Sequence, residues 1–117
     1  MTGRTLNTVA ELTPAGETRM TFELLSDSDG SPLVRITGEL DMQTIPELEA
    51  GVASLMTGRT SRLVVDVSGV DFADSSAIAL WVRWANHVRE IELRGPPLLI
   101  QRVIARMGLA EKLPMTP

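Results

Sequence analysis

The stretch LVVDVSGVDFADSS, Leu63–Ser76, decides the fold of this chain of 117 residues. Its first part, Leu63–Val67, is almost entirely apolar and β-branched, which is the pattern of a central parallel strand covered on both faces. A loop follows, and a residue within Asp74–Ser76 can cap a helix that runs to about Ala85 or Val88. The stretch therefore predicts one β–α unit of an α/β fold.

Upstream of this unit, the sequence predicts an antiparallel β-hairpin. Met20, Phe22 and Leu24 alternate with polar residues and lie on one face of a strand. The segment Ser26–Pro32 is rich in turn-forming residues, and Leu33–Thr37 provides the second strand.

Between the hairpin and the central strand, the sequence predicts a first helix. Thr44 is followed three residues later by Glu47, which is the spacing of a capping box. Gly58 is expected to end this helix. The apolar positions at helical spacing are Leu48, Val52, Leu55 and Met56.

Downstream, Ile91–Arg94 is a candidate strand, and Leu98–Met107 predicts a third helix that Gly108 ends. Its packing positions are expected to be Leu99, Val103 and Met107. This order predicts a single α/β domain, an N-terminal β-hairpin followed by βαβα units, with a mixed, largely parallel sheet and helices packed on it. Residues 1–19 are expected to be a flexible lead-in, and residues 20–117 the domain.

Composition excludes several classes of function. The net charge of −4 and an aromatic content of 3% argue against a nucleic-acid partner. The absence of cysteine removes thiolate catalysis and thiolate metal sites, and the apolar stretches are too short to span a membrane. The charge is uneven, because residues 1–80 carry a net −7 and residues 81–117 a net +3. A partner of the first part would meet an acidic surface if those charges stay exposed.

The sequence offers little for catalysis or metal binding. The only histidine, His87, lies about three helical turns from Ser75, too far to act as its general base. Asp66, Asp71 and Asp74 carry ligands that suit Mg²⁺ or Ca²⁺, but their spacing matches no EF-hand loop, and turn formation or helix capping explains two of them. No glycine-rich phosphate loop occurs, so we expect neither a cofactor nor a metal.

What remains is a pair of hydroxyls at a helix N-terminus, beyond the carboxyl end of a buried strand, where α/β sheets place their functional crevice. Helix capping by Asp74 or Ser75 explains one hydroxyl. It does not explain two serines flanked by the small residues Ala73 and Ala77, which leave the site sterically open.

Three segments, Gly38–Asp41, Leu63–Ser76 and Met107–Leu109, resemble a STAS domain, specifically the bacterial anti-sigma factor antagonists. The resemblance runs from about Met20 to Leu113. It implies a cytoplasmic binding protein rather than an enzyme. Such a protein binds an anti-sigma factor that is also a serine kinase, and thereby releases a sigma factor. It also implies no nucleic-acid or membrane partner, and it allows a weak homodimer.

The resemblance implies that the kinase phosphorylates the first serine after the aspartate, and that a metal-dependent serine phosphatase reverses the step. Asp41 and Asp74 would then flank the phosphorylated Ser75 and face a basic partner, although Asp41 fits a turn or cap equally well. Thr44 is expected to cap its helix rather than to be a second phosphorylation site. The predicted partner-binding residues are Asp41, Thr44, Asp74, Ser75, Ser76 and Ile78, of which Ser76 would hydrogen-bond locally and Ile78 is a partner contact or a core residue.

A second class of function shares this fold. The alternative is a STAS subunit that docks to the ATPase of a lipid or solute transport complex and is never phosphorylated. Ser75 favours the antagonist, because a transport subunit needs no phosphate acceptor. Exposure of Trp81 and Trp84 would favour the transport subunit.

Overall fold

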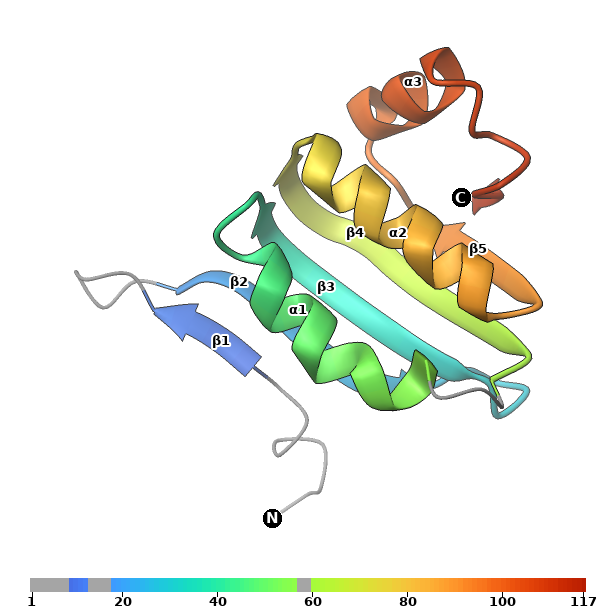
Figure 1. Cartoon of the computed structure of the whole chain (residues 1–117), viewed down its shortest axis with the longest axis horizontal. Helices are drawn as coiled ribbons and strands as arrows, with labels where there is room; N and C mark the ends of the chain where they lie inside the picture. The colour runs from blue at the N-terminus through green and yellow to red at the C-terminus, as the bar shows by residue number, and fades with distance from the viewer. Residues whose placement is uncertain (1–8, 13–17, 57–59) are drawn as a thin grey trace.

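The fold is built on one mixed sheet of six strands in the order β1-β2-β3-β4-β5-β6 (Figure 1), seen in a computed structural model that describes residues 9–12, 18–56 and 60–117. The first two pairs of neighbouring strands are antiparallel and the last three are parallel. The strands are β1 (Val9–Leu12), β2 (Thr18–Ser26), β3 (Pro32–Leu40), β4 (Arg62–Ala73), β5 (Glu90–Arg94) and β6 (Met115–Thr116). The helical segments are α1 (Ile45–Val52), the short 3₁₀ helix η2 (Ala53–Met56), α2 (Ser75–His87) and α3 (Leu98–Arg106).

The predicted hairpin and the α/β order are confirmed. β2 and β3 pair antiparallel with Phe22 opposite Ile36, and Met20 and Phe22 are buried. β1 was not predicted: it pairs with β2 from inside the segment expected to be a lead-in. Four residues are too few for a visible alternation, but their pairing covers the otherwise open edge of β2.

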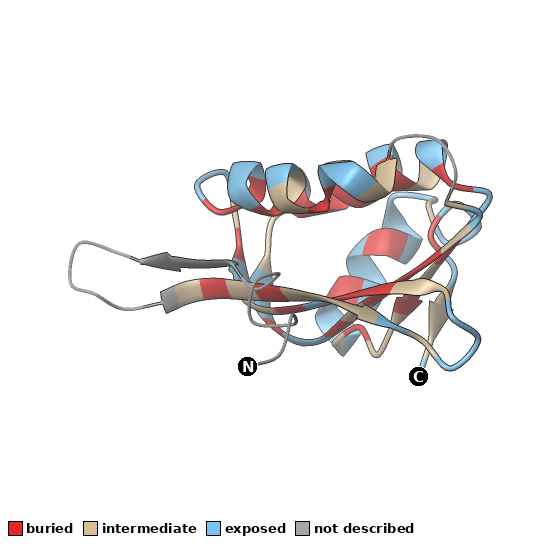
Figure 2. Ribbon diagram, turned by 90° about the horizontal axis from the view of Figure 1, so that it is seen from below, coloured by how far each residue is buried: buried red, intermediate tan, exposed pale blue. Residues whose placement is uncertain are grey.

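Helices α1 and α2 cover one face of the sheet and enclose the core (Figures 1 and 2). Trp81 and Trp84 lie inside this core, with 0% and 2% of their surface exposed. The exposed tryptophan pair that would have favoured a transport subunit is therefore absent. No helix among the described residues has both the length and the apolar character needed to cross a membrane.

The opposite face of the sheet is largely polar, so the expectation that β4 is covered on both faces holds at the fully buried Val64 but not at Asp66. Asp66 alternates with the buried Val65 and Val67, and its carboxylate accepts hydrogen bonds from Ser68 and Arg35 instead of packing under a helix. Leu63–Val65 and Val67 resemble a two-sided strand, but the one charged residue among them, Asp66, lies on the polar face.

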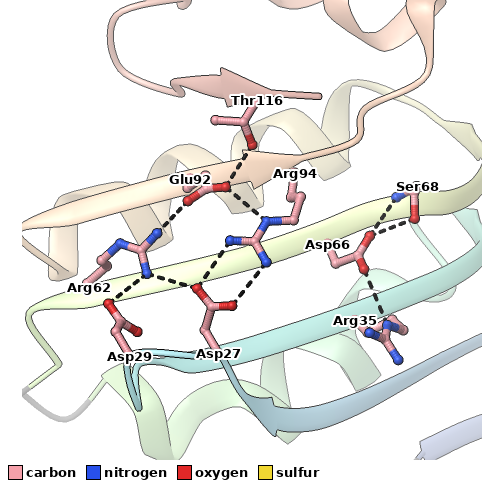
Figure 3. A network of polar contacts seen from close by, with 9 residues as sticks. All are labelled: Asp27, Asp29, Arg35, Arg62, Asp66, Ser68, Glu92, Arg94 and Thr116. Carbon is pink, nitrogen blue, oxygen red and sulfur yellow. Dashed lines mark hydrogen bonds and ion pairs between the residues drawn. The ribbon is translucent and has the colours of Figure 1, made fainter.

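A group of ion pairs ties the strands together on this face, here called the sheet-face network (Figure 3). Arg94 donates to Asp27 at 3.1 Å and to Glu92 at 3.0 Å. Because its members come from the β2–β3 turn and from β4, β5 and β6, the network links the hairpin to three neighbouring strands on the open face. Its members are Asp27, Asp29, Arg62, Glu92, Arg94 and Thr116.

Helix α3 is present as predicted, but a different face of it packs. Ile100 and Ile104 enter the core, whereas Leu99 and Val103 are 72% and 39% exposed and Met107 is also exposed. Gly108 ends the helix as predicted, with a φ of 73° and the Leu109 N–H bonded to the Ile104 carbonyl at 3.0 Å. The predicted stop of α1 at Gly58 lies outside the described residues.

Candidate functional site

The site lies where β3 and β4 end side by side. Leu40 is in register with Ala73, the last residue of β4. The Asp74 N–H then donates to the Leu40 carbonyl at 3.1 Å. This bond holds the β3–α1 loop against the N-terminus of α2. The predicted placement of the site at the carboxyl ends of parallel strands therefore agrees with the geometry.

Asp74 caps α2. Its backbone is extended, and its Oδ1 accepts the Ser76 N–H at 2.8 Å. The Ser76 hydroxyl donates to the same oxygen, so Ser76 bonds locally, as predicted. One carboxylate thus satisfies one of the free N–H groups of the first helical turn and also fixes the second serine.

Ser75 differs from its neighbour. It is the first residue of α2 and is exposed. Its hydroxyl makes no hydrogen bond with any described residue. A free hydroxyl at the N-terminus of a helix of 13 residues lies where N–H groups and the helix dipole favour negative charge. The geometry therefore separates the two serines, one held and one available.

Asp41 organises the loop before α1. Its Oδ1 accepts the N–H groups of Gln43 at 2.9 Å and Thr44 at 3.1 Å, and its other oxygen pairs with Arg19. Partial burial acts to raise the pKa of Asp41, but the Arg19 guanidinium and the two N–H donors outweigh it and hold the pKa below its usual value. The turn-forming role, one of two left open by the sequence, is thus present in the structure.

Thr44 does not form the predicted capping box. Its own backbone is helical and its side chain makes no cap bond. The hydroxyl instead donates to the Glu39 carbonyl at 2.8 Å and accepts the Asp41 N–H at 3.0 Å, and the residue is fully buried. The Thr44 hydroxyl therefore bonds the end of β3 instead of capping α1.

The remaining candidates lie apart from the serines or beneath them. Ile78 is 3% exposed and belongs to the core. His87 lies at the far end of α2, where its Nδ1 bonds the Arg83 carbonyl at 2.9 Å. Asp66 projects from the open sheet face while Asp74 caps α2, and the described residues hold no cluster of three metal-binding side chains.

The sequence missed an apolar groove next to the serines. A cavity of about 160 Å³ lies between the end of β4, α2 and α3, and Phe72 and Leu99 line it with much of their surface exposed. The apolar positions of α3 were a visible signal, but they were assigned to the core. We call this cavity, with its lining residues Val70–Ala73, Ile78, Pro97, Leu99, Ile100 and Val103, the α3 groove.

Comparison with known proteins places this geometry in context. The profile of the family described as "Mlab, STAS domain" matches residues 24–116. The structure resembles that of an anti-sigma factor antagonist from Mycobacterium paratuberculosis, with a TM-score of 0.75 and 26% identity over 84% of this chain and 86% of that one. No curated protein sequence gives a match.

Two structures of SpoIIAA share the fold at 19% identity. The unphosphorylated anti-sigma factor antagonist SpoIIAA gives a TM-score of 0.68 over 82% of this chain and 88% of that one. The phosphorylated form of this protein, described as a Bacillus cell fate determinant, gives 0.65 over 82% and 91%.

Proposed function

The chain belongs to the STAS domain family, and we propose that it is a cytoplasmic anti-sigma factor antagonist controlled by phosphorylation of Ser75. In this proposal the unphosphorylated protein binds an anti-sigma factor and so releases a sigma factor. The likeness to an antagonist of known structure at 26% identity, over most of both chains, supports the general role. The role is that of a binding protein rather than an enzyme.

One observation carries the choice of residue. Of the two adjacent serines, Ser76 is fixed by Asp74 through both its N–H and its hydroxyl, whereas the Ser75 hydroxyl is exposed and unbonded among the described residues. A kinase must bring the acceptor hydroxyl in line with the γ-phosphorus of ATP. Ser75 can do this without breaking the helix cap, and Ser76 cannot.

The proposed chemistry is reversible. The anti-sigma factor, acting as a serine kinase, transfers the γ-phosphoryl group of ATP to Ser75 Oγ, which loses its proton as ADP leaves. A metal-dependent serine phosphatase returns the hydroxyl by transferring the phosphoryl group to water, with release of inorganic phosphate. The antagonist itself supplies the acceptor and needs no cofactor.

The phosphate is compatible with the fold but not with the complex. It adds about −1.5 to −2 charges at pH 7, and the N-terminus of α2 accommodates an anion. In a complex, the same charge would be buried beside Asp74 against a surface shaped for a neutral hydroxyl. A thousandfold loss of affinity requires only about 4 kcal/mol, which a buried and unpaired charge supplies.

The predicted contact residues divide by exposure. Ser75 and Asp74 can touch a partner directly, and Asp41 reaches the surface with its charge already paired to Arg19. Thr44 and Ile78 are buried, so in this proposal they support the two loops from beneath. The basic partner surface expected opposite Asp41 and Asp74 remains part of the proposal.

The experiment is intact-mass measurement after incubation with ATP and each anti-sigma kinase encoded by the same genome. We expect one added phosphate on the wild type and on Ser76→Ala, and none on Ser75→Ala. We also expect Ser75→Asp to bind that kinase much more weakly than wild type. If no kinase modifies the chain and Ser75→Asp binds partners normally, the STAS subunit that docks to a transport ATPase becomes the better account.

A further inference from the structure

The α3 groove exposes more apolar surface than the core requires. Phe72, at the end of β4, is 52% exposed, and Leu99 on α3 is 72% exposed. Both line the cavity of about 160 Å³, whose floor includes the buried Ile78 and Ile100. An apolar hollow of this size, open to solvent and lined by exposed apolar side chains, marks a site for an apolar side chain of another molecule.

Two unpaired arginines of α3 lie beside the groove, whose lining also includes one exposed carboxylate, that of Asp71. At helical spacing, Arg102 and Arg106 lie along the side of α3 next to Leu99, away from the buried face. Neither forms an ion pair with any described residue. Apart from Arg89, which is exposed and outside the groove, the other arginines of the described residues pair with carboxylates; they are Arg19, Arg35, Arg62, Arg83 and Arg94.

The groove and the serine site are continuous. Phe72 and Ala73 are the last residues of β4, three and two positions before Ser75, and Ile78 follows Ser75 about one helical turn later. A segment seated in the groove therefore passes beside the Ser75 hydroxyl. One partner can occupy both places.

We infer that the α3 groove receives an apolar side chain from an acidic amphipathic segment of the partner that Ser75 controls, with the carboxylates of that segment facing Arg102 and Arg106. The identity of the partner as an anti-sigma factor rests on the proposed function. The shape and charge of the segment rest on the groove.

This arrangement adds a reason for the phosphate to block binding. The partner segment is negatively charged, so a phosphate on Ser75 repels those of its carboxylates that lie within the screening length of about 8 Å at physiological salt. The repulsion acts on the segment as it enters the groove. It comes in addition to the cost of burying the phosphate itself.

The first test measures the affinity of groove variants for the anti-sigma kinase that phosphorylates the wild type. Leu99→Glu is expected to weaken binding about tenfold or more, since it places a charge in the groove and repels the acidic segment. Its matched control is Leu98→Glu, on the same helix, 58% exposed and outside the groove. Both residues are exposed, so both variants should fold, and urea unfolding checks this.

The charge is tested in the same way. Arg106→Glu should weaken binding about tenfold, and Arg89→Glu, an exposed arginine outside the groove, should change it less than about twofold. Unchanged affinity of both Leu99→Glu and Arg106→Glu for a kinase that binds wild type would overturn the inference. The proposed function would survive that result.

A second test does not depend on the proposed function. Two synthetic peptides carry one central leucine flanked either by glutamates or by lysines, and NMR follows the signals of Phe72, Leu99 and Val103. We expect the glutamate peptide to shift these signals and the lysine peptide to leave them unchanged. If no anti-sigma kinase binds the chain, the proposed function fails and the peptides alone decide the inference. No shift with the glutamate peptide, or equal shifts with both, rejects it.

Discussion

Asp41 allows a substitution pair that separates a structural role from a binding role. Its Oδ1 accepts two backbone N–H groups at the start of the β3–α1 loop, and its charge faces Arg19. Asp41→Asn keeps an oxygen acceptor for the two N–H groups and removes the charge. Asp41→Ala removes both.

The magnitudes follow from these contacts. The Thr44 N–H is shared between the Asp41 side chain and the Asp41 backbone carbonyl, each at 3.1 Å, and the alanine variant keeps the carbonyl. The variant therefore loses the whole of the bond from the Gln43 N–H and only the side-chain part of the bond from Thr44. Helix-start bonds of this kind contribute about 1.5 kcal/mol. For a chain of this size, Asp41→Ala should therefore lower the melting temperature by about 6 °C. Asp41→Asn should lose less than half of that, because a solvent-accessible ion pair contributes little.

Thermal unfolding followed by tryptophan fluorescence measures the melting temperature of both variants, and urea unfolding measures their free energy of unfolding, since Trp81 and Trp84 are buried in the native state. Equal destabilisation by Asp41→Asn and Asp41→Ala would refute the reasoning. It would show that the ion pair between Asp41 and Arg19, rather than the two N–H bonds, holds the loop. Binding to the anti-sigma factor adds the second readout. If the Asp41 carboxylate touches a basic partner surface, Asp41→Asn loses affinity while keeping its stability.

Three further predictions use the same unfolding assay. Gly51→Ala should lower the free energy of unfolding by about 1 kcal/mol, because the new Cβ would lie 2.0 Å from Cζ of the buried Phe22 ring. Overpacking costs about 1–3 kcal/mol, which outweighs the gain of about 1 kcal/mol in helix propensity. A stabilised variant would show that the ring moves freely. Asp74→Ala should lower the free energy of unfolding by about 1 kcal/mol through loss of the α2 cap. Asp71→Ala, at an exposed residue near the end of β4, should change that free energy little. Equal effects of the two variants would contradict the capping role of Asp74. In the sheet-face network, the Thr116 hydroxyl and then the Arg94 guanidinium hold the pKa of Glu92 below its usual value despite partial burial. The contribution of Glu92 to folding stability is therefore fully present above about pH 5 and is lost as the pH falls through the folded pKa. Glu92→Gln should reduce the pH dependence of stability below pH 5, roughly, and an unchanged acid limb would place that dependence elsewhere.

The parts of the fold that the sequence predicted depend on local patterns. The alternation around Met20 and Phe22, the apolar run Leu63–Val67 and the turn residues between them each act over a few residues, so a single chain shows them. The Asp74 cap is also local, because its partner is two residues away. These elements formed where they were expected, with one exception. The segment after Val67, expected to be a loop, continues β4 as far as Ala73, because it keeps pairing with β3.

The features that were missed depend on contacts between distant parts of the chain. Thr44 has the spacing of a capping box, yet its hydroxyl bonds the Glu39 carbonyl because β3 ends beside it. α3 carries two apolar faces, and only the position of the sheet decides that Ile104 is buried and Leu99 is exposed. β1 forms because β2 offers an open edge to pair with. None of these outcomes is encoded within one helix or strand.

Net charge shows the same limit and bears directly on function. The sequence places −7 in residues 1–80, which predicts an acidic surface for a partner. In the structure, two arginines from residues 81–117 offset part of that excess, because Arg83 pairs with Glu49 and Arg94 with Asp27. Other carboxylates, such as Asp41 and Asp66, are already paired with arginines of the same part of the chain. On α3, beside the α3 groove, Arg102 and Arg106 have no such partners among the described residues. A partner of this region therefore meets carboxylates at Asp74 and Asp71 close to Ser75 and unpaired arginines on α3. The position of the unpaired groups, rather than the net charge of the chain, sets the charge that each part of the partner faces.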